Sequence, residues 1–410
     1  MDKVEPRKRL LVVSPTFPYP LVSGGKQRVF YVLRELARRF DITLLSLAEV
    51  GDDTPAARDA LSFLSALETV PIRQNRLAQL LRVGLRIPQW LLGAPAEVLV
   101  KRTPALDAAY TAMLMSGDFD AVLIEYSQLL HLVTPAKDVG LLVAVTAHDV
   151  SFVSQQRKAE VSSGFWRWFW MREARLMKAH EMRGWRRADL VFAMSDTDRQ
   201  QIQGLLPEVQ VHSMPNGVDT PSLQPLPESA EPSLIFVGWM RHFPNQDAVR
   251  WLFSDIWPLI RQGHPQVRLK LAGGGLPDDL QRVAAQDERV EYLGFVDDIA
   301  AAVGSATLSL VPIRVGSGSR LKILESMALA TPVVSTRVGS EGIAATDGEH
   351  LVLADRPEEF ADAVINLLGD QARRQALAER ARSLVEEVYD WRAIGENGAG
   401  LLARLMERRP

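Results

Sequence analysis

A glycine-serine turn that leads into a helix, in the stretch VGSGSRLKILESMALATPVVST (residues 315–336), is the part of this chain best suited to chemistry. Gly316 and Gly318 have no Cβ, so the backbone there can approach a ligand closely. The helix that follows begins with unpaired N–H groups and the positive end of a dipole, which together favour an anion. Lys322 and Glu325, three residues apart, share one face of that helix. These features indicate a ligand that carries phosphate.

The same stretch also has a purely structural interpretation. Ser317 or Ser319 would then cap a helix that buries Leu321, Leu324 and Ala328 in a core. Glycine-serine helix starts are common, so the position alone favours this simpler interpretation. The choice depends on what the rest of the chain places beside the turn.

Glycine and polar residues follow predicted strands elsewhere as well. Gly24 and Gly25 precede a helix, where their amides could approach a diphosphate or could simply form a tight turn. His148 closes an apolar strand, at a place where sites form but where structural histidines also occur. Gly238 and Gly294 end two later strands. Since open parallel sheets bind ligands at the carboxyl ends of their strands, we expect these residues in binding loops.

Two sets of apolar runs supply the strands that would hold these loops. The runs are continuous rather than alternating, as expected for parallel strands covered by helices on both faces. They span residues 9–14, 41–47, 121–126, 140–147, 188–195 and 209–214 in the first set, and 233–238, 266–275, 289–296, 306–313, 331–336 and 350–355 in the second. Helices are predicted between them, for example over 26–39, 244–262 and 357–368. The pattern predicts an α/β protein with two doubly wound, Rossmann-like domains facing a central cleft.

Length and composition agree with two domains. The chain has 410 residues, beyond the size at which one core stops growing, and a proline-rich connector spans 220–232. We therefore expect an N-terminal domain over 1–219 and a C-terminal domain over 220–385. The net charge of −3 divides into +3 for residues 1–219 and −6 for the remainder. This balance argues against nucleic-acid binding, and no known nucleic-acid module appears.

The absence of cysteine excludes disulfides, catalytic thiols and thiolate metal sites, and fits a reducing compartment. The first apolar run is too short for a signal peptide or a membrane span, and no later window approaches that length. We expect a cytoplasmic protein.

Several of these motifs together resemble one family. The chain carries, in order, GGKQR, AHDV, ADLVFAMSDTDR, PNGVD, VGWMRHFPNQDA, LAGGG, LGFVDD and GSGSRLKILESMALATPVVST. This series resembles the GT-B glycosyltransferases of family 4 (group 1), and is most similar to a bacterial branch associated with exopolysaccharide and cell-surface sugar assembly. The resemblance spans nearly the whole chain and is weakest over 51–116. It implies that the terminal segment, 386–410, forms a helix that crosses back to the N-terminal domain.

The resemblance also implies a chemistry. The family transfers a sugar, with retention, from a nucleotide-diphosphate sugar bound mainly by the C-terminal domain to an acceptor bound mainly by the N-terminal domain. Its members usually carry two glutamates separated by seven residues. Glu325 matches the second, which binds the ribose hydroxyls, whereas Ser317 stands where the first is expected. Many relatives also have an arginine and a lysine where Trp239 and Pro244 stand here, and Arg241 lies between those two positions.

From the resemblance we predict three catalytic residues. His148 would contact the donor sugar near the reacting carbon, and Lys322 and Arg241 would neutralise the diphosphate, although a solvated surface arginine is the alternative for Arg241. The predicted donor-binding residues are Gly24, Gly25, Gly238, Gly294, Phe295, Val296, Gly316, Ser317, Gly318, Ser319 and Glu325. We expect no metal and no cofactor other than the nucleotide sugar itself. The DFD triplet at 118–120 imitates a metal motif but precedes a strand instead of following one, which favours a turn.

The segment Arg157–Arg187 is distinctive outside these motifs. It contains nine lysines or arginines against three acids, together with six large aromatic residues. Basic residues interleaved with tryptophan are typical of a helix on an anionic membrane surface. Another basic stretch, Arg73–Arg102, carries Trp90. The open alternative is a long helix whose aromatic residues pack inside and whose arginines reach solvent.

The function we predict is a glycosyltransferase that moves a hexose-type sugar onto a growing surface glycan or a lipid-linked acceptor. It would be cytoplasmic, with peripheral contact to the inner face of the plasma membrane as an open question. Two alternatives are a nucleotide-sugar isomerase of the same fold and, because Ser317 replaces a glutamate, a non-catalytic sugar-nucleotide binding protein. An oxidoreductase is disfavoured because no G-x-G-x-x-G follows the first strand.

Overall fold

The computed structural model describes residues 7–72, 87–160, 162–315 and 321–407 of the chain. The chain forms two compact units, unit 1 with residues 1–215 and 394–410, and unit 2 with residues 216–393. The first division lies close to the sequence-based boundary at 219/220. The chain returns to unit 1 at Ile394, inside its last helix.

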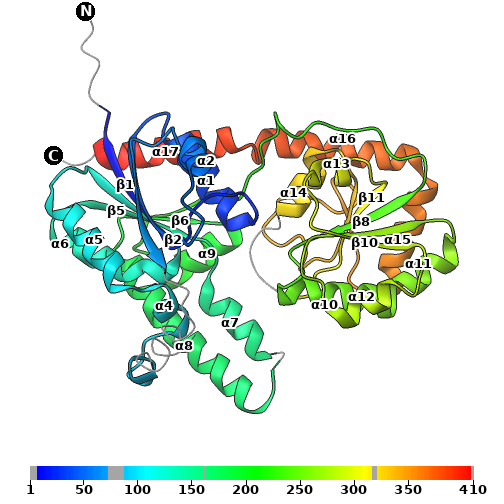
Figure 1. Ribbon diagram of the computed structural model, residues 1–410, viewed down its shortest axis with the longest axis horizontal. Helices are drawn as coiled ribbons and strands as arrows, with labels where there is room; N and C mark the ends of the chain where they lie inside the picture. The colour runs from blue at the N-terminus through cyan, green and yellow to red at the C-terminus, as the bar shows by residue number, and fades with distance from the viewer. Residues whose placement is uncertain (1–6, 73–86, 161, 316–320, 408–410) are drawn as a thin grey trace, which may run out of the picture. The chain divides into compact units, whose positions relative to one another are not determined.

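Unit 1 is built on a parallel sheet with the strand order β3-β2-β1-β4-β5-β6-β7 (Figure 1). Its strands are β1 (Arg9–Ser14), β2 (Asp41–Glu49), β3 (Ala66–Ile72), β4 (Ala121–Glu125), β5 (Leu142–Ala147), β6 (Leu190–Ala193) and β7 (Val211–Ser213). Its helices are α1 (Gly24–Leu36), α2 (Pro55–Ala60), α4 (Ala96–Lys101), α5 (Pro104–Met115), η1 (Ser127–Leu132), α6 (Val133–Asp138), α7 (Ser151–Glu160), α8 (Gly164–Arg187) and α9 (Asp196–Leu205). Strand β4 is buried at every residue, because helices cover both faces of the sheet.

Unit 2 repeats the plan with the strand order β10-β9-β8-β11-β12-β13. Its strands are β8 (Ser233–Val237), β9 (Arg268–Ala272), β10 (Val290–Gly294), β11 (Leu308–Val311), β12 (Val333–Ser335) and β13 (Val352–Leu353). Its helices are α10 (Phe243–Trp251), the π-helical turn η2 (Leu252–Ile256), α11 (Trp257–Gly263), α12 (Asp278–Ala284), α13 (Ile299–Gly304), α14 (Leu321–Ala328), α15 (Pro357–Gly369) and α16 (Gln371–Val388). Two doubly wound parallel sheets, as predicted, are therefore present.

Each sheet has one place where the strand order reverses. In unit 1 the chain moves outward from β1 to β2 and β3 and then crosses back to β4, which pairs with β1 through Val13 and Ile124. In unit 2 the same reversal lies between β8 and β11, which pair through Leu234 and Leu308. Loops diverge at such points and leave a crevice at the carboxyl ends of the strands. Ligand chemistry is therefore expected after β1 and β4 in unit 1 and after β8 and β11 in unit 2.

Three elements differ from the sequence-based prediction. Strand β3 (Ala66–Ile72) lies in the region where no strand was predicted, and it pairs with β2 along its whole length. The helix predicted over 244–262 is interrupted by the π-helical turn η2. The basic aromatic segment 157–187 is not one helix but the end of α7 and the whole of α8, which begins at Gly164 with a φ of 54°.

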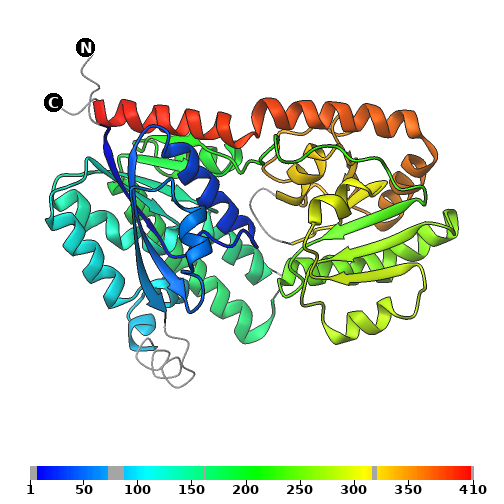
Figure 2. The same cartoon turned by 45° about the horizontal axis from the view of Figure 1, so that its top comes forward.

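The last helix, α17 (Trp391–Glu407), packs along unit 1 (Figure 2). A Cβ placed at Gly395 would lie 2.2 Å from the Cβ of Glu35 on α1, so the two helices meet where neither has room for another atom. A Cβ at Gly400, further along α17, would meet only the guanidinium of Arg404, at 3.7 Å. The contact with α1 therefore requires glycine at one position of this helix and tolerates a side chain at the other.

Replacing Gly395 with alanine should separate α17 from α1 and lower the free energy of unfolding by about 1–3 kcal/mol. The matched variant Gly400→Ala should instead be neutral or stabilise by up to about 1 kcal/mol, because alanine is the better helix former. Urea denaturation followed by circular dichroism compares the two. Equal midpoints for both variants would refute the close helix contact.

Candidate active site

A buried carboxylate holds His148 in unit 1. Glu125 ends β4 and is 2% exposed, and its Oε2 lies 2.6 Å from His148 Nε2. The hydroxyl of Thr146 donates to the other oxygen of Glu125 at 3.2 Å. This pairing follows from the sheet, since β4 and β5 run in register with Glu125 opposite Thr146. The His148 side chain is 10% exposed.

Arg28 of α1 supplies the positive charge that accompanies Glu125. It is 1% exposed, and its guanidinium donates to the carbonyl oxygens of Met214 at 2.8 Å and Pro215 at 2.7 Å. Burial lowers the pKa of Arg28 to about 10, against the opposing effect of Glu125. Arg28 therefore remains charged at neutral pH and adds a buried cation to the surroundings of His148.

These charges decide which nitrogen of His148 carries the proton. Burial lowers the pKa of His148, while the hydrogen bond to Glu125 and its charge oppose that shift. The ring is therefore neutral at pH 7. Because an ionised Glu125 can only accept, Nε2 carries the hydrogen and Nδ1 keeps its lone pair. His148 thus offers a hydrogen-bond acceptor, such as a sugar hydroxyl would need.

Tyr126 connects His148 to the start of α1. It has a φ of 71°, uncommon for a residue with a side chain, and its ring stacks on His148 with centroids 3.5 Å apart and planes 8° apart. A Cβ at Gly25 would lie 2.3 Å from the Tyr126 hydroxyl oxygen, so only glycine fits there. Burial raises the pKa of Tyr126, which keeps its hydroxyl protonated. Gly24 and Gly25 form the first turn of α1, behind the cap Ser23.

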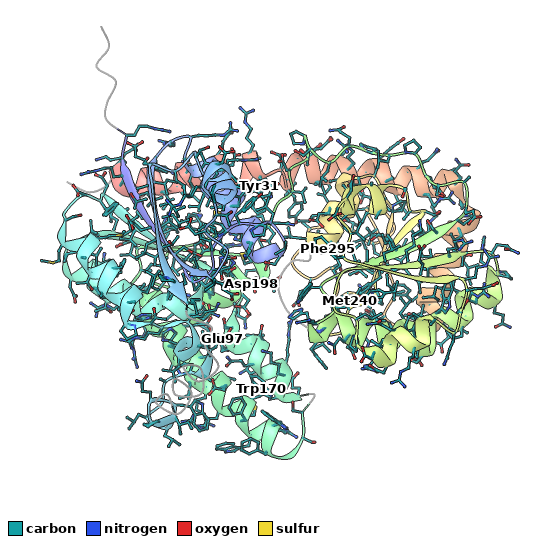
Figure 3. All side chains as sticks on the ribbon, viewed as in Figure 1. Tyr31, Glu97, Trp170, Asp198, Met240 and Phe295 are labelled. Atoms are coloured by element: carbon teal, nitrogen blue, oxygen red, sulfur yellow. The ribbon has the colours of Figure 1, made fainter. Side chains whose placement is uncertain are left out.

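The loop after β8 approaches the loop after β9 closely in unit 2. A Cβ at Gly273, which has a φ of 130°, would lie 1.9 Å from the carbonyl oxygen of Gly238. The buried Met240 (labelled in Figure 3) donates its N–H to the carbonyl oxygen of Gly274 at 3.0 Å. Gly294, at the end of β10, accepts from the N–H of Gly273 at 2.7 Å. The glycines thus bring three strand ends together.

Lys322 reaches these loops from α14. Its ammonium donates to Asn245 Oδ1 at 2.9 Å and lies 4.5 Å from the ring centroid of Phe236 on β8. The amide nitrogen of Asn245 in turn donates to the carbonyl oxygen of Trp239 at 2.8 Å. Asn245 therefore links the cation of α14 to the loop after β8, and a Cβ at Gly238 would press on this amide at 2.7 Å.

The other predicted residues of unit 2 are more exposed. Arg241 lies at the surface, with its guanidinium 5.9 Å from the ring centroid of Trp239. Phe295 is 67% exposed, and Val296 packs at the edge of a small apolar cluster. Glu325 lies half-buried on α14, one turn after Lys322. The predicted donor-binding residues Gly316, Ser317, Gly318 and Ser319 lie outside the described residues.

The predicted residues thus divide between the two units, and most of them lie in loops at the carboxyl ends of strands. The residues of unit 1 are Gly24, Gly25 and His148, and those of unit 2 are Gly238, Arg241, Gly294, Phe295, Val296, Lys322 and Glu325. The sequence analysis missed Arg28, Glu125, Tyr126 and Asn245. The available signal for Glu125 was its position as an acid at the end of the otherwise apolar strand AVLIEY. The available signal for Asn245 was its position in the first turn of a helix that follows a glycine loop.

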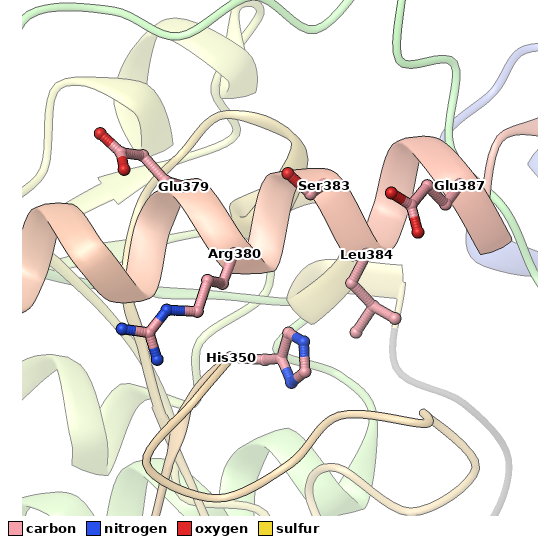
Figure 4. Close-up of a pocket in the computed structure, with 6 residues that line it drawn as sticks. All are labelled: His350, Glu379, Arg380, Ser383, Leu384 and Glu387. Atoms are coloured by element: carbon pink, nitrogen blue, oxygen red, sulfur yellow. The ribbon is translucent and has the colours of Figure 1, made fainter.

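Two further features lie apart from these groups. A surface pocket of about 390 Å³ is lined by His350 and five residues of α16, Glu379, Arg380, Ser383, Leu384 and Glu387 (Figure 4). His350 precedes β13, so this pocket adjoins the amino ends of the strands, the edge opposite the glycine loops. Within the described ranges, no three His, Asp or Glu side chains are grouped as metal ligands. No helix in those ranges has the length and apolar content that a bilayer crossing requires.

Comparison with known proteins identifies the fold class and the family. The structure matches sucrose-phosphate synthase from Thermosynechococcus elongatus with a TM-score of 0.74 at 17% identity, over 98% of this chain and 100% of that one. It matches the Anabaena protein Alr3699/HepE, solved with UDP and glucose, with a TM-score of 0.71 at 15% identity, over 97% and 100%. These two structural matches define the fold as that of the GT-B glycosyltransferases.

Residues 22–221 match the family model described as Glycosyltransferase Family 4, and residues 231–370 match that of Glycosyl transferases group 1. The two models describe successive parts of the same enzymes, and the chain belongs to the family 4, group 1 glycosyltransferases. The phosphatidyl-myo-inositol mannosyltransferase of Mycobacterium leprae is 30% identical over 44% of this chain and 50% of its own length. The chain spans about half the length of the curated relatives it matches first.

Removing the charge of Glu125 should make His148 harder to protonate. In the Glu125→Gln variant the anion that raises the pKa of His148 is gone, while burial and Arg28, which lower it, remain. The pKa of His148 should fall below its value in the unmodified protein. If activity requires a neutral His148, the acid limb of the pH–rate profile moves to lower pH. An NMR titration of the His148 ring measures the shift directly.

Glu97→Gln is the matched control, because Glu97 accepts hydrogen bonds from Gln128 at 2.7 Å and Gln155 at 3.2 Å on the same unit but does not contact His148. It should leave the titration unchanged. A rise in the His148 pKa on Glu125→Gln would contradict the electrostatic effect assigned to Glu125.

Proposed function

We propose that this protein is a retaining glycosyltransferase that moves a hexose-type sugar from a nucleotide-diphosphate sugar to a glycan or lipid-linked acceptor in surface-polysaccharide synthesis. The observation that carries the proposal is the ammonium of Lys322, which Asn245 holds beside the glycine loops at the carboxyl ends of β8 and β9. A fixed cation beside closely approached backbone suits a diphosphate. The UDP and glucose of the HepE complex are consistent with this class of donor.

The donor contacts follow from unit 2. Lys322 balances the charge of the diphosphate, and Arg241 adds to it from the exposed loop after β8. Glu325, one turn along α14, accepts hydrogen bonds from the ribose hydroxyls. Gly294, Phe295 and Val296 provide backbone and an exposed ring beside the base. No metal and no other cofactor takes part in this proposal, and unchanged activity in EDTA would support it.

The reaction breaks the bond between the anomeric carbon and the β-phosphate oxygen, whose electron pair leaves with the diphosphate. The acceptor hydroxyl attacks the same face of the sugar, so that configuration is retained, and its proton passes to the departing phosphate oxygen. Charge on that oxygen grows as the bond breaks, which a preorganised cation stabilises. His148, neutral and accepting through Nδ1, binds a sugar hydroxyl and orients the ring.

A screen of nucleotide ligands by thermal shift tests the donor site. UDP, GDP, ADP and their sugars are compared, since a ligand at a hundred times its dissociation constant stabilises a protein by about 2.7 kcal/mol. One of them should raise the melting temperature, and Glu325→Ala should reduce that shift because the ribose contacts are lost. Glu358, an exposed acid at the start of α15, supplies the control variant Glu358→Ala. Absence of any shift would refute the donor site.

Lys322→Met should lower kcat by about 10²–10³-fold, because the cation acts most strongly on the charge that forms in the transition state. The KM for the donor should change much less. Lys270→Met, which removes a lysine from the middle of β9, is the control and should keep normal kinetics. An increase in KM at constant kcat would assign Lys322 to binding alone.

A further inference from the structure

We propose that the α7–α8 extension of unit 1 binds the surface of an anionic lipid bilayer through an aromatic tip. The aromatic tip consists of Leu91, Leu92, Phe165, Trp166, Trp168 and Met171. Figure 1 and Figure 3 show α7 and α8 projecting from unit 1, with Trp170 labelled near their far end. This proposal does not depend on the donor, the acceptor or the catalytic residues.

The apolar side chains of the aromatic tip are exposed as a group and not singly. Phe165 is 64% exposed, Trp166 is 59% and Trp168 is 54%, and Leu92, from the neighbouring segment, is 87%. Single exposed apolar side chains are normal on protein surfaces, but a group of this kind marks an interaction site. Phenylalanine and tryptophan at adjacent positions suit the interfacial layer of a bilayer, where the rings enter and the indole N–H stays hydrated.

Trp90 fixes these side chains in place. Its ring stacks on Phe169 at 5.9 Å between centroids and meets Trp168 edge-on at 6.4 Å, while the guanidinium of Arg172 covers it at 3.9 Å. Its indole nitrogen donates to Glu173. Trp170 meets the cluster through Phe169, edge-on at 5.0 Å between centroids, and the ammonium of Lys158 lies 4.7 Å from its ring centroid. The tip is thus built on packed aromatic residues that present the others outward.

The charge of α8 explains the choice of lipid. Both acids of this helix point inward: Glu173 is 1% exposed and accepts from the N–H of Ala96 at 2.7 Å, and Glu181 is 0% exposed and caps α7 through the N–H groups of Ser151 and Phe152. The exposed charges of α8 are therefore all basic. At its base, Arg186 and Arg187 pair with Glu208 and Asp138, whereas Arg167 and Arg175 lie exposed toward the tip.

The residue spacing in α8 places exposed apolar side chains and an exposed arginine on the same face of the helix. Trp168, Met171 and Arg175 are three and four residues apart, so they share one side of α8. An apolar end followed by arginines on the same face matches a bilayer interface with anionic headgroups. A second copy of this chain would bring two positively charged tips together, which disfavours self-association. A bilayer is therefore the partner that both the rings and the charges fit.

Co-sedimentation of the full chain with vesicles tests the proposal. The protein should pellet with vesicles of phosphatidylcholine and phosphatidylglycerol, less with phosphatidylcholine alone, and less again at high salt. The triple variant Phe165→Ser, Trp166→Ser, Trp168→Ser should bind on the order of tenfold more weakly. Arg167→Glu with Arg175→Glu should remove the preference for phosphatidylglycerol. Met115→Ser, which removes an exposed apolar side chain (73%) on α5, is the control and should bind normally.

Two additional measurements keep the test decisive. Circular dichroism and activity on a soluble acceptor should match for the variants and the unmodified protein, because the tip lies outside the catalytic residues. Acrylamide should quench tip tryptophans in solution and lose access once vesicles are added. Unchanged pelleting of the triple variant, tryptophans already shielded without lipid, a dimer that the triple variant abolishes, or stronger binding to RNA than to vesicles would each overturn the proposal.

Discussion

All of the candidate chemistry depends on one constraint: the carboxyl ends of parallel strands all lie at the same edge of a sheet, so the loops that follow them lie there too. In unit 1 the ends of β1, β4 and β5 deliver Gly25, Glu125 and His148 to that edge. In unit 2 the ends of β8 and β9 deliver Gly238 and Gly273, close enough that a single added carbon would overlap a carbonyl oxygen. The helices that cover the sheets then supply the cations, Arg28 from α1 and Lys322 from α14. Sheet topology, more than any one motif, brings these groups together.

The charged groups at the two edges are arranged differently. In unit 1 the charged side chains Arg28 and Glu125 are both buried, and Glu125 is hydrogen-bonded to the neutral imidazole of His148. Such a cluster is costly to assemble and resists change, which suits the orientation of a sugar. In unit 2 the cation, the ammonium of Lys322, is only partly buried and donates a hydrogen bond to the neutral amide of Asn245. Under the proposed function, the ammonium of Lys322 would stay held by Asn245 while its remaining N–H groups donate to the diphosphate.

Much of this could be predicted from the sequence, because the relevant signals are local. Continuous apolar runs located β1, β4 and β8, and the glycines after β1 and β8 marked two of the loops at the reversal points. The partners of those residues could not be predicted. Glu125 contacts His148 because of the register between their strands, and Asn245 contacts Lys322 across 77 positions of sequence. Neither pair produces a periodic pattern in the sequence from which it could be predicted. Strand β3 was not predicted for another reason: it lies at the edge of the sheet and only Val70 is buried, so its sequence lacks the continuous apolar pattern of the central strands.

The return of the chain to unit 1 at Ile394 has a consequence for biosynthesis. A ribosome makes residues 216–393 before it makes the helix that packs against Glu35, so the second globule is available to fold while the first still lacks its closing segment. The packing of α1 against α17 around Glu35 therefore cannot form until Gly395 has been synthesised, after the whole of unit 2.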